Sequence, residues 1–186
     1  MNETTYTTTA KSGKGARHGV VSELTAFLTI KPGEADALRE GLHTFHERIR
    51  NAPWDVIQKI GIVDIKHVIF DDDTRVIWNT TFDTDWDPYV DDAFALIGSG
   101  PWTGWVQHVV EYDPEDWNSG RGIKRFAQAA QVPAAEYSRS IPDLTLSQVK
   151  EAQRVKEAFE KVLDTPGALE ALQNPVLKPL LDVAAG

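Results

Sequence analysis

The chain has 186 residues, of which 41% are hydrophobic and 25% charged, a composition typical of one folded domain, with or without an appendage, rather than of a disordered chain. Its formal net charge of -9 argues against nucleic acid and anionic membrane surfaces as partners, because binding to phosphate groups needs a surplus of Lys and Arg. The absence of Cys excludes disulfides, thiolate catalysis and thiolate metal sites.

The chain begins with a polar stretch, residues 1–19, that is rich in Thr and Gly. It lacks the apolar segment of a secretory signal, and no later run reaches the roughly 20 apolar residues that cross a bilayer. We therefore expect a mobile arm at the start of a soluble cytoplasmic protein that has no membrane partner.

A strand, a helix and a hairpin follow this arm. Apolar and polar residues alternate over Val21–Ile30, which predicts a strand with one strongly apolar face. Apolar residues then recur three and four positions apart over residues 35–49, which is typical of a helix with one apolar stripe. Residues 62–70 and 74–82 both have the composition of strands, and the short polar connection DDDT between them predicts a hairpin.

A second helix and a fourth strand complete the predicted domain. The helix is predicted in DWDPYVDDAFALIG, where Asp85 or Asp87 can cap its start and Gly98 can end it. The segment Gly104–Tyr112 then predicts the strand. The order β-α-β-β-α-β over residues 20–112 predicts an α+β fold, a ferredoxin-like antiparallel sheet with both helices on one face.

Residues 113–186 are expected to form a helical extension that ends in a docking tail. A short helix is predicted at residues 123–131. The clearest helix covers residues 145–164, where Thr145 and Gln148 make a capping box and the apolar residues form one stripe. Apolar residues in the last segment suggest that it docks on another surface, such as a partner subunit.

Two stretches resemble known proteins: HVIFDDDTRVIWNTTFDTDWDPYVDDAF and, later, AAQVPAAEYSRSIPDLT. They are similar to segments of proteins in the dimeric α+β barrel superfamily, and the resemblance covers Val21 to Leu146, with Thr84 where the pattern has Gly. Members pair two ferredoxin-like sheets face to face, and they include antibiotic-biosynthesis monooxygenases, haem-degrading monooxygenases, chlorite dismutase and dye-decolorising peroxidases. The resemblance implies a homodimer or higher homo-oligomer.

The alternating acids Asp83, Asp85 and Asp87 begin like a calcium-binding loop. The sixth position of the loop is Pro88, where Gly is needed, and the twelfth is Phe94, where a bidentate Glu is needed. We therefore expect these acids to cap a helix, and we predict no metal site.

Two histidines on predicted strands, His67 and His108, are the candidate catalytic residues. Each is either a structural residue or a general base, and if the protein binds haem, as the resemblance implies, one of them is the axial ligand. His43 and His46 share one face of the first helix, but no third metal ligand lies near them in the sequence, and His43 with Glu47 is a simpler pair.

Six Trp residues are generous for this length. The candidate ligand-binding residues are Trp78, Phe82, Trp86, Trp105 and Asn79. Aromatic side chains with a few polar partners suit a pocket for a small apolar molecule. They suit a dimer interface between two sheets equally well, and we place the interface slightly ahead.

Two functions stay open on this evidence. The first is a dimeric α+β barrel that binds a small apolar ligand, with monooxygenase- or peroxidase-like oxidoreductase activity if the protein is an enzyme. The alternative is a non-catalytic binding or assembly module that uses its sheet face and helical tail for protein contacts. No Ser-His-Asp signature, phosphate-binding Gly loop or dinucleotide fingerprint points to other chemistry.

Overall fold

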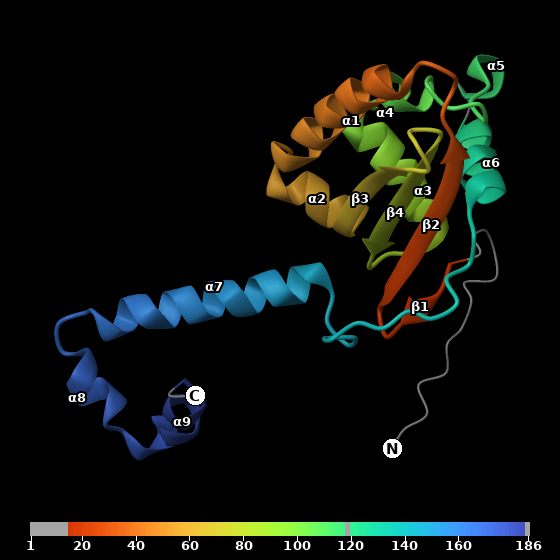
Figure 1. Cartoon of the computed structure of the whole chain (residues 1–186). Coiled ribbons are helices and arrows are strands. Elements are labelled where there is room, and N and C mark those ends of the chain that lie inside the picture. Colours follow the sequence, from red (N-terminus) through yellow and green to blue (C-terminus); the bar gives the residue numbers. More distant parts are fainter. Residues whose placement is uncertain (1–14, 118–119, 185–186) are drawn as a thin grey trace. The chain divides into compact units, whose positions relative to one another are not determined.

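The computed structural model describes residues 15–117 and 120–184 (Figure 1). Most of the predicted N-terminal arm, residues 1–14, lies outside this range. The chain divides into two compact units, Met1–Leu146 and Ser147–Gly186. Within the described part of the chain, no helix combines the length and the apolar content that a membrane crossing requires.

A four-stranded antiparallel sheet forms the centre of the first unit and confirms the predicted α+β class. Its strands follow the order β1-β2-β4-β3 across the sheet. Their bounds are β1 Arg17–His18, β2 Val21–Thr29, β3 Ile62–Phe70 and β4 Arg75–Phe82. The three long strands agree with the predicted strands to within one residue at each end. The pairing of β3 with β4 contains one register shift, between Ile62 and Asp64.

The connection between β3 and β4 is the predicted hairpin turn. Asp71, Asp72 and Asp73 all have left-handed backbones, with φ of 57°, 50° and 64°. Asp tolerates this region better than most residues because its short polar side chain can bond to the local backbone. Thr74 closes the turn, since its backbone N–H and its hydroxyl both donate to the carbonyl oxygen of Asp71, at 3.1 and 2.6 Å.

Three helices pack against one face of the sheet, as Figure 1 shows: α1 (Ala35–Arg50), α3 (Trp86–Ile97) and α4 (Ser99–Val106). The helices α1 and α3 confirm two predictions. The predicted apolar stripe of α1 buries Leu38, Leu42 and Phe45 against the sheet. A further helix, α2 (Trp54–Ile60), was not predicted, because seven residues are too few to establish a helical period.

The predicted strand Gly104–Tyr112 is wrong, because α4 continues to Val106 and the residues after it form turns with a single bridge, from Val109 to Ile30. Packing explains why the segment starts as a helix. Trp102, Trp105 and Val106 lie three and four positions apart, so a helix can bury all three on one face.

The rest of the first unit covers the outer edge of β2. The helices α5 (Pro114–Trp117) and α6 (Gly120–Ala130) follow α4, and α6 agrees with the predicted short helix. Beyond α6, Gln131 bridges Ala26, and the N–H of Val132 donates to the carbonyl of Thr25 at 2.8 Å. The first unit therefore extends well past residue 112.

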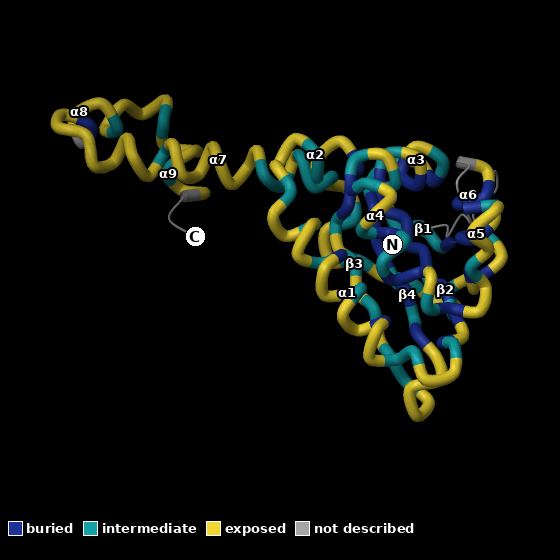
Figure 2. Tube along the Cα trace, turned by 90° about the horizontal axis from the view of Figure 1, so that it is seen from above, coloured by how far each residue is buried: buried dark blue, intermediate teal, exposed yellow. Residues whose placement is uncertain are grey.

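The second unit is helical. It contains most of α7 (Leu146–Leu163), which matches the clearest predicted helix, followed by α8 (Ala168–Leu172), a 3-10 turn η1 (Pro175–Leu177) and α9 (Lys178–Ala184). No residue of α7 is buried (Figure 2), although its sequence carries an apolar stripe. Val155 on α7 and Val176 on η1 are 62% and 81% exposed.

Candidate functional site

The face of the sheet opposite the helices carries no helix within residues 15–146, and we call it the open face. Strand register arranges its side chains in four rows that cross β2, β4 and β3. In order along the strands, the rows are Thr29, Arg75 and Phe70; Phe27, Ile77 and Val68; Thr25, Asn79 and Lys66; and Glu23, Thr81 and Asp64. The second row is wholly apolar, and its Val68 is 43% exposed.

Arg75 lies over two aromatic rings that contact each other at one end of the open face. The centre of its guanidinium lies 5.6 Å from the ring centroid of Phe27 and 5.3 Å from that of Phe70. Contacts of this kind attract the cation to the ring faces and restrict its motion. Among the described residues, no carboxylate forms an ion pair with Arg75.

The other end of the open face is acidic. Glu23 is only 2% exposed, and its carboxylate accepts hydrogen bonds from the N–H of Ala16 and from the hydroxyl of Thr25, at 3.0 and 2.7 Å. Asp64 in the same row is exposed and accepts a bond from the hydroxyl of Thr81 at 2.8 Å. Burial raises the pKa of Tyr137, and the charges of Asp64 and Glu23 add to this shift, so Tyr137 lies near this end.

The predicted ligand-binding residue Asn79 lies in the third row of the open face, where its side chain donates to the hydroxyl of Thr25 at 2.7 Å. The four predicted aromatic residues occupy the helix-covered side: Trp78 and Phe82 point there from β4, because side chains alternate along a strand, and Trp86 and Trp105 belong to α3 and α4. Trp78, Phe82, Trp86 and Trp105 are at most 3% exposed. The structure therefore separates Asn79 from the aromatic residues.

An aromatic cluster fills the space between the sheet and its helices. Trp78 lies 5.5 and 5.9 Å from the rings of Trp102 and Trp105, measured between centroids, and Phe45 lies 4.6 Å from Trp102. Phe82 stacks on Tyr89 at 4.1 Å, with the two rings nearly parallel. These contacts make the aromatic residues the core of the first unit.

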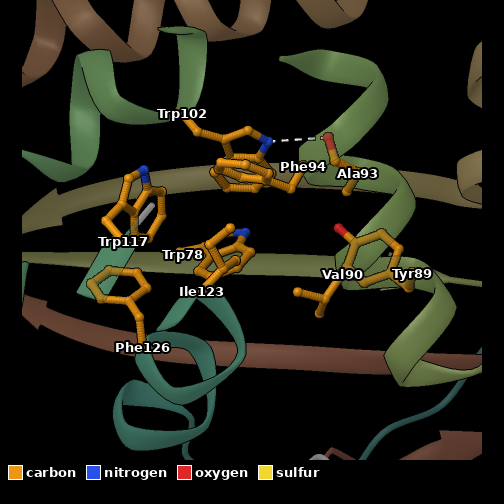
Figure 3. A pocket seen from close by; sticks show the side chains of 9 residues that line it. All are labelled: Trp78, Tyr89, Val90, Ala93, Phe94, Trp102, Trp117, Ile123 and Phe126. Atoms are coloured by element: carbon orange, nitrogen blue, oxygen red, sulfur yellow. Dashed lines mark hydrogen bonds between the residues drawn. The ribbon is translucent and has the colours of Figure 1, made fainter. Parts of the chain in front are cut away.

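A cavity of about 10 Å³ remains beside this cluster, room for roughly one water molecule. Figure 3 shows aromatic rings from β4, α3, α4, α5 and α6 converging on it. The indole N–H of Trp102 donates to the carbonyl of Ala93 at 3.1 Å, and that of Trp117 donates to the hydroxyl of Thr103 at 3.1 Å. Ligand pockets usually measure hundreds of cubic ångströms, so this cavity holds no drug-sized ligand in the observed arrangement.

His67 meets His46 across the interface between β3 and α1. Its Nδ1 lies 3.0 Å from Nε2 of His46, and its ring packs edge-on against Phe45 and Trp105. Burial, with a smaller contribution from His46, lowers the pKa of His67 to about 3. The pKa of His46 is also lowered, mainly by burial and to a smaller extent by the charge of Arg50. Both rings are therefore neutral near pH 7, and one donates to the other.

Three buried nitrogens in this region have no hydrogen-bond partner among the described residues: Nε2 of His67 and the indole nitrogens of Trp78 and Trp105. The rings of His67 and Trp105 are 4.8 Å apart, so these nitrogens belong to one cluster. Leaving a buried polar group without a partner costs about 1–3 kcal/mol. Such groups call for a functional or structural explanation.

Haem, which the resemblance implies, does not fit beside His67. Nδ1 of His67 is already in contact with His46 at 3.0 Å, and the rings of Phe45 and Trp105 pack against the imidazole. The free Nε2 of His67 is enclosed and faces no open space. No step that involves haem is therefore assigned to this chain.

His108 lies outside the strands of the sheet. It sits in the turn after α4, at the edge of β2, whereas His67 is on β3, the opposite edge. Its Nδ1 is 2.8 Å from a carboxylate oxygen of Glu34, and its carbonyl accepts from the N–H of Lys31. The two candidate catalytic histidines are not brought together.

The acids around α3 form structural contacts. Asp85 occupies the N-cap position of α3 but makes no side-chain cap bond, and it lies 3.7 Å from Arg17. Asp87 and Asp91 both pair with Lys124 of α6 at 2.9 Å, which ties α3 to α6. In residues 15–117 and 120–184, no group of three or more His, Asp or Glu is placed to hold a metal ion.

No family model, curated protein or solved structure matches this chain. The candidate sites therefore rest on geometry alone.

Sequence reasoning missed two features of these sites. The pairing of His46 with His67 depends on how α1 crosses β3, which no local pattern encodes. The contact of Arg75 with Phe27 and Phe70 could have been predicted in part. A four-residue hairpin turn places Phe70 opposite Arg75 on the neighbouring strand.

Proposed function

We propose that this protein is a homodimeric binding module in which the open faces of two copies pack together. The observation that carries the proposal is the apolar row of Phe27, Ile77 and Val68 on a face that no helix covers within residues 15–146. This function corresponds to the assembly alternative, with the sheet face as the contact surface.

The composition of the open face supports this proposal. An antiparallel sheet with one solvated face usually alternates apolar and polar residues, so the solvated face is polar. Here an apolar row lies between charged rows, and apolar patches with a polar rim mark interaction surfaces. The core on the other side of the sheet is already complete, so Phe27 and Ile77 are not required for it.

A ferredoxin-like fold is part of the same proposal. In chain order the first unit contains β2, α1, β3, β4 and α3, and the segment around Val109 then returns to the free edge of β2. This arrangement is compatible with a split β-α-β unit whose last strand is reduced to one bridge. Such units leave one sheet face open, as the proposed dimer requires.

Sedimentation of the full chain tests the proposal, with a matched pair of valine substitutions. Val68 and Val155 are 43% and 62% exposed; Val68 lies on the open face, and Val155 lies on α7 in the second unit. We expect the wild type and Val155→Glu to be dimers and Val68→Glu to be a monomer that keeps its circular dichroism spectrum. A monomeric wild type, or a Val68→Glu dimer as tight as the wild type, would refute the proposed dimer.

A small apolar ligand bound beneath the sheet is a second candidate function, which the three unpartnered nitrogens favour. The aromatic cluster would have to open to admit it, since the present cavity holds roughly one water. Indole is a suitable probe. A saturable rise in Tm that weakens in Trp78→Phe would support this function, and no shift up to the solubility limit of indole would dismiss it.

A further inference from the structure

We infer that Arg75 of each copy pairs with Asp64 of the other copy, and that these two reciprocal ion pairs set the orientation of the dimer. The inference rests on the proposed dimer and specifies how its faces are oriented. It starts from the two ends of the open face, which carry opposite charge.

Arg75 is suited to receive a carboxylate from another molecule. Its guanidinium already rests over the rings of Phe27 and Phe70, so less side-chain freedom is lost when it binds. It has no ion-pair partner among the described residues, although the chain carries a net charge of -9. A planar guanidinium can grip a carboxylate with two parallel hydrogen bonds.

Asp64 is the available carboxylate at the other end. It is exposed, and among the described residues its carboxylate accepts a hydrogen bond from Thr81 at Oδ2, which leaves Oδ1 open to a donor. Glu23 in the same row is buried and already accepts bonds from Ala16, Ala134 and Thr25, so it is not available in the same way.

The symmetry of a two-fold dimer decides which rows meet, because residue i contacts j wherever j contacts i. A two-fold axis parallel to the strands places each row over its own copy, so that Arg75 faces Arg75 and Asp64 faces Asp64. An axis across the strands exchanges the ends, so that the Arg75 row lies over the Asp64 row of the second copy. Juxtaposed like charges suppress an arrangement, whereas complementary charges favour it, so the second axis is selected.

The middle rows are compatible with this orientation. The apolar row then lies over Thr25, Asn79 and Lys66 of the second copy. The hydroxyl of Thr25 already accepts from Asn79, so covering these two groups leaves them paired. Lys66 can cover Val68 with its aliphatic stem and keep its charge at the rim.

Mixing two charge-reversal variants of the full chain tests the orientation directly. In homodimers, Arg75→Glu places two pairs of negative groups together, and Asp64→Arg places two pairs of positive groups together. We expect each variant alone to raise the dimer Kd by at least roughly 100-fold in sedimentation equilibrium. A mixture of both has opposite charges at both contacts, so we expect a heterodimer with a Kd within about tenfold of the wild type.

Arg121→Glu is the control, because Arg121 is exposed on α6 and this change alters net charge equally away from the open face. If the wild type is a dimer but neither reversal weakens it, or the mixture fails to associate, the Arg75–Asp64 inference is wrong and the dimer stands. If the wild type is a monomer, the proposed dimer itself fails.

Discussion

His67 Nδ1 lies 3.0 Å from His46 Nε2, while the other nitrogen of His67 is buried without a partner. This contact joins the edge strand β3 to α1 through two neutral rings. A proton added to His67 would place a charge inside an aromatic cluster, which explains why burial dominates the shift in its pKa.

The first prediction concerns acid stability. The pKa of His67 is lowered from 6.5 to about 3 in the fold, so between these values the unfolded chain binds the proton and the native chain does not. Stability is therefore complete above pH 6.5 and falls as the pH drops towards 3, with a loss on the order of 2 kcal/mol at pH 5. Urea unfolding of the wild type at pH 7.5 and pH 5 measures this loss.

Two variants separate this effect from general acid sensitivity. His67→Phe removes the titrating ring and should shrink the difference between pH 7.5 and pH 5, whereas His43→Gln, on the exposed side of α1, should retain it. Equal pH dependence in the wild type and His67→Phe would contradict the prediction.

The second prediction concerns two glycines where α1 crosses α4. A Cβ on Gly41 would lie 2.1 Å from the carbonyl oxygen of Gly104, whereas a Cβ on Gly104 would meet nothing within 4 Å. Gly41→Ala should therefore cost about 1–3 kcal/mol of unfolding free energy. Gly104→Ala should be neutral or stabilise by up to about 1 kcal/mol, because Ala is the better helix former. Urea unfolding measures the stability of both variants, and a Gly104→Ala variant less stable than Gly41→Ala would contradict the prediction.

The third prediction concerns a buried hydroxyl pair. The hydroxyl of Thr80 donates to the carbonyl of Asp64 at 2.9 Å and lies 2.7 Å from the hydroxyl of Tyr89, which must then be the donor. Thr80→Val leaves that hydroxyl buried without an acceptor, at a cost of about 1–3 kcal/mol. Tyr89→Phe removes the donor and leaves Thr80 satisfied, so it should cost less. Thermal unfolding that ranks the two variants the other way would contradict this assignment of donor and acceptor.

The fourth prediction concerns haem. Because Nε2 of His67 is enclosed and Nδ1 of His108 is already paired with Glu34, equimolar haemin should give the wild type the same Soret spectrum as His67→Ala and His108→Ala. A shifted Soret band in the wild type that disappears in either variant would show that the aromatic cluster opens to admit haem.

Local sequence patterns were enough to predict the long strands and the hairpin, because local forces largely determine them. The period-two alternation of residues 21–29 and the DDDT turn were sufficient for the strands and the hairpin. The strand predicted at residues 104–112 does not form, because the outcome there depends on contacts distant in sequence: Gly41 admits the backbone of α4 at close range, and the sheet buries Trp102 and Trp105.

The candidate site was less accessible to sequence reasoning. Its aromatic residues were identified as a pocket or an interface, but burial places Trp78 and Trp105 in the core. Neighbouring residues on a strand point to opposite faces of the sheet, so Asn79 lies on the open face whereas Trp78 lies in the core. Local sequence does not show which of the two faces the helices cover.

Both edges of the sheet are protected against uncontrolled strand addition. On β3, the register shift after Ile62 interrupts the ladder, and the charged side chains of Asp64 and Lys66 discourage an incoming strand from another chain. On β2, the segments at Val109 and Gln131 occupy the free edge. An apolar sheet surface would ordinarily create a risk of fibrous aggregation. Here the blunted edges disfavour that outcome and are compatible with the proposed closed, face-to-face pairing.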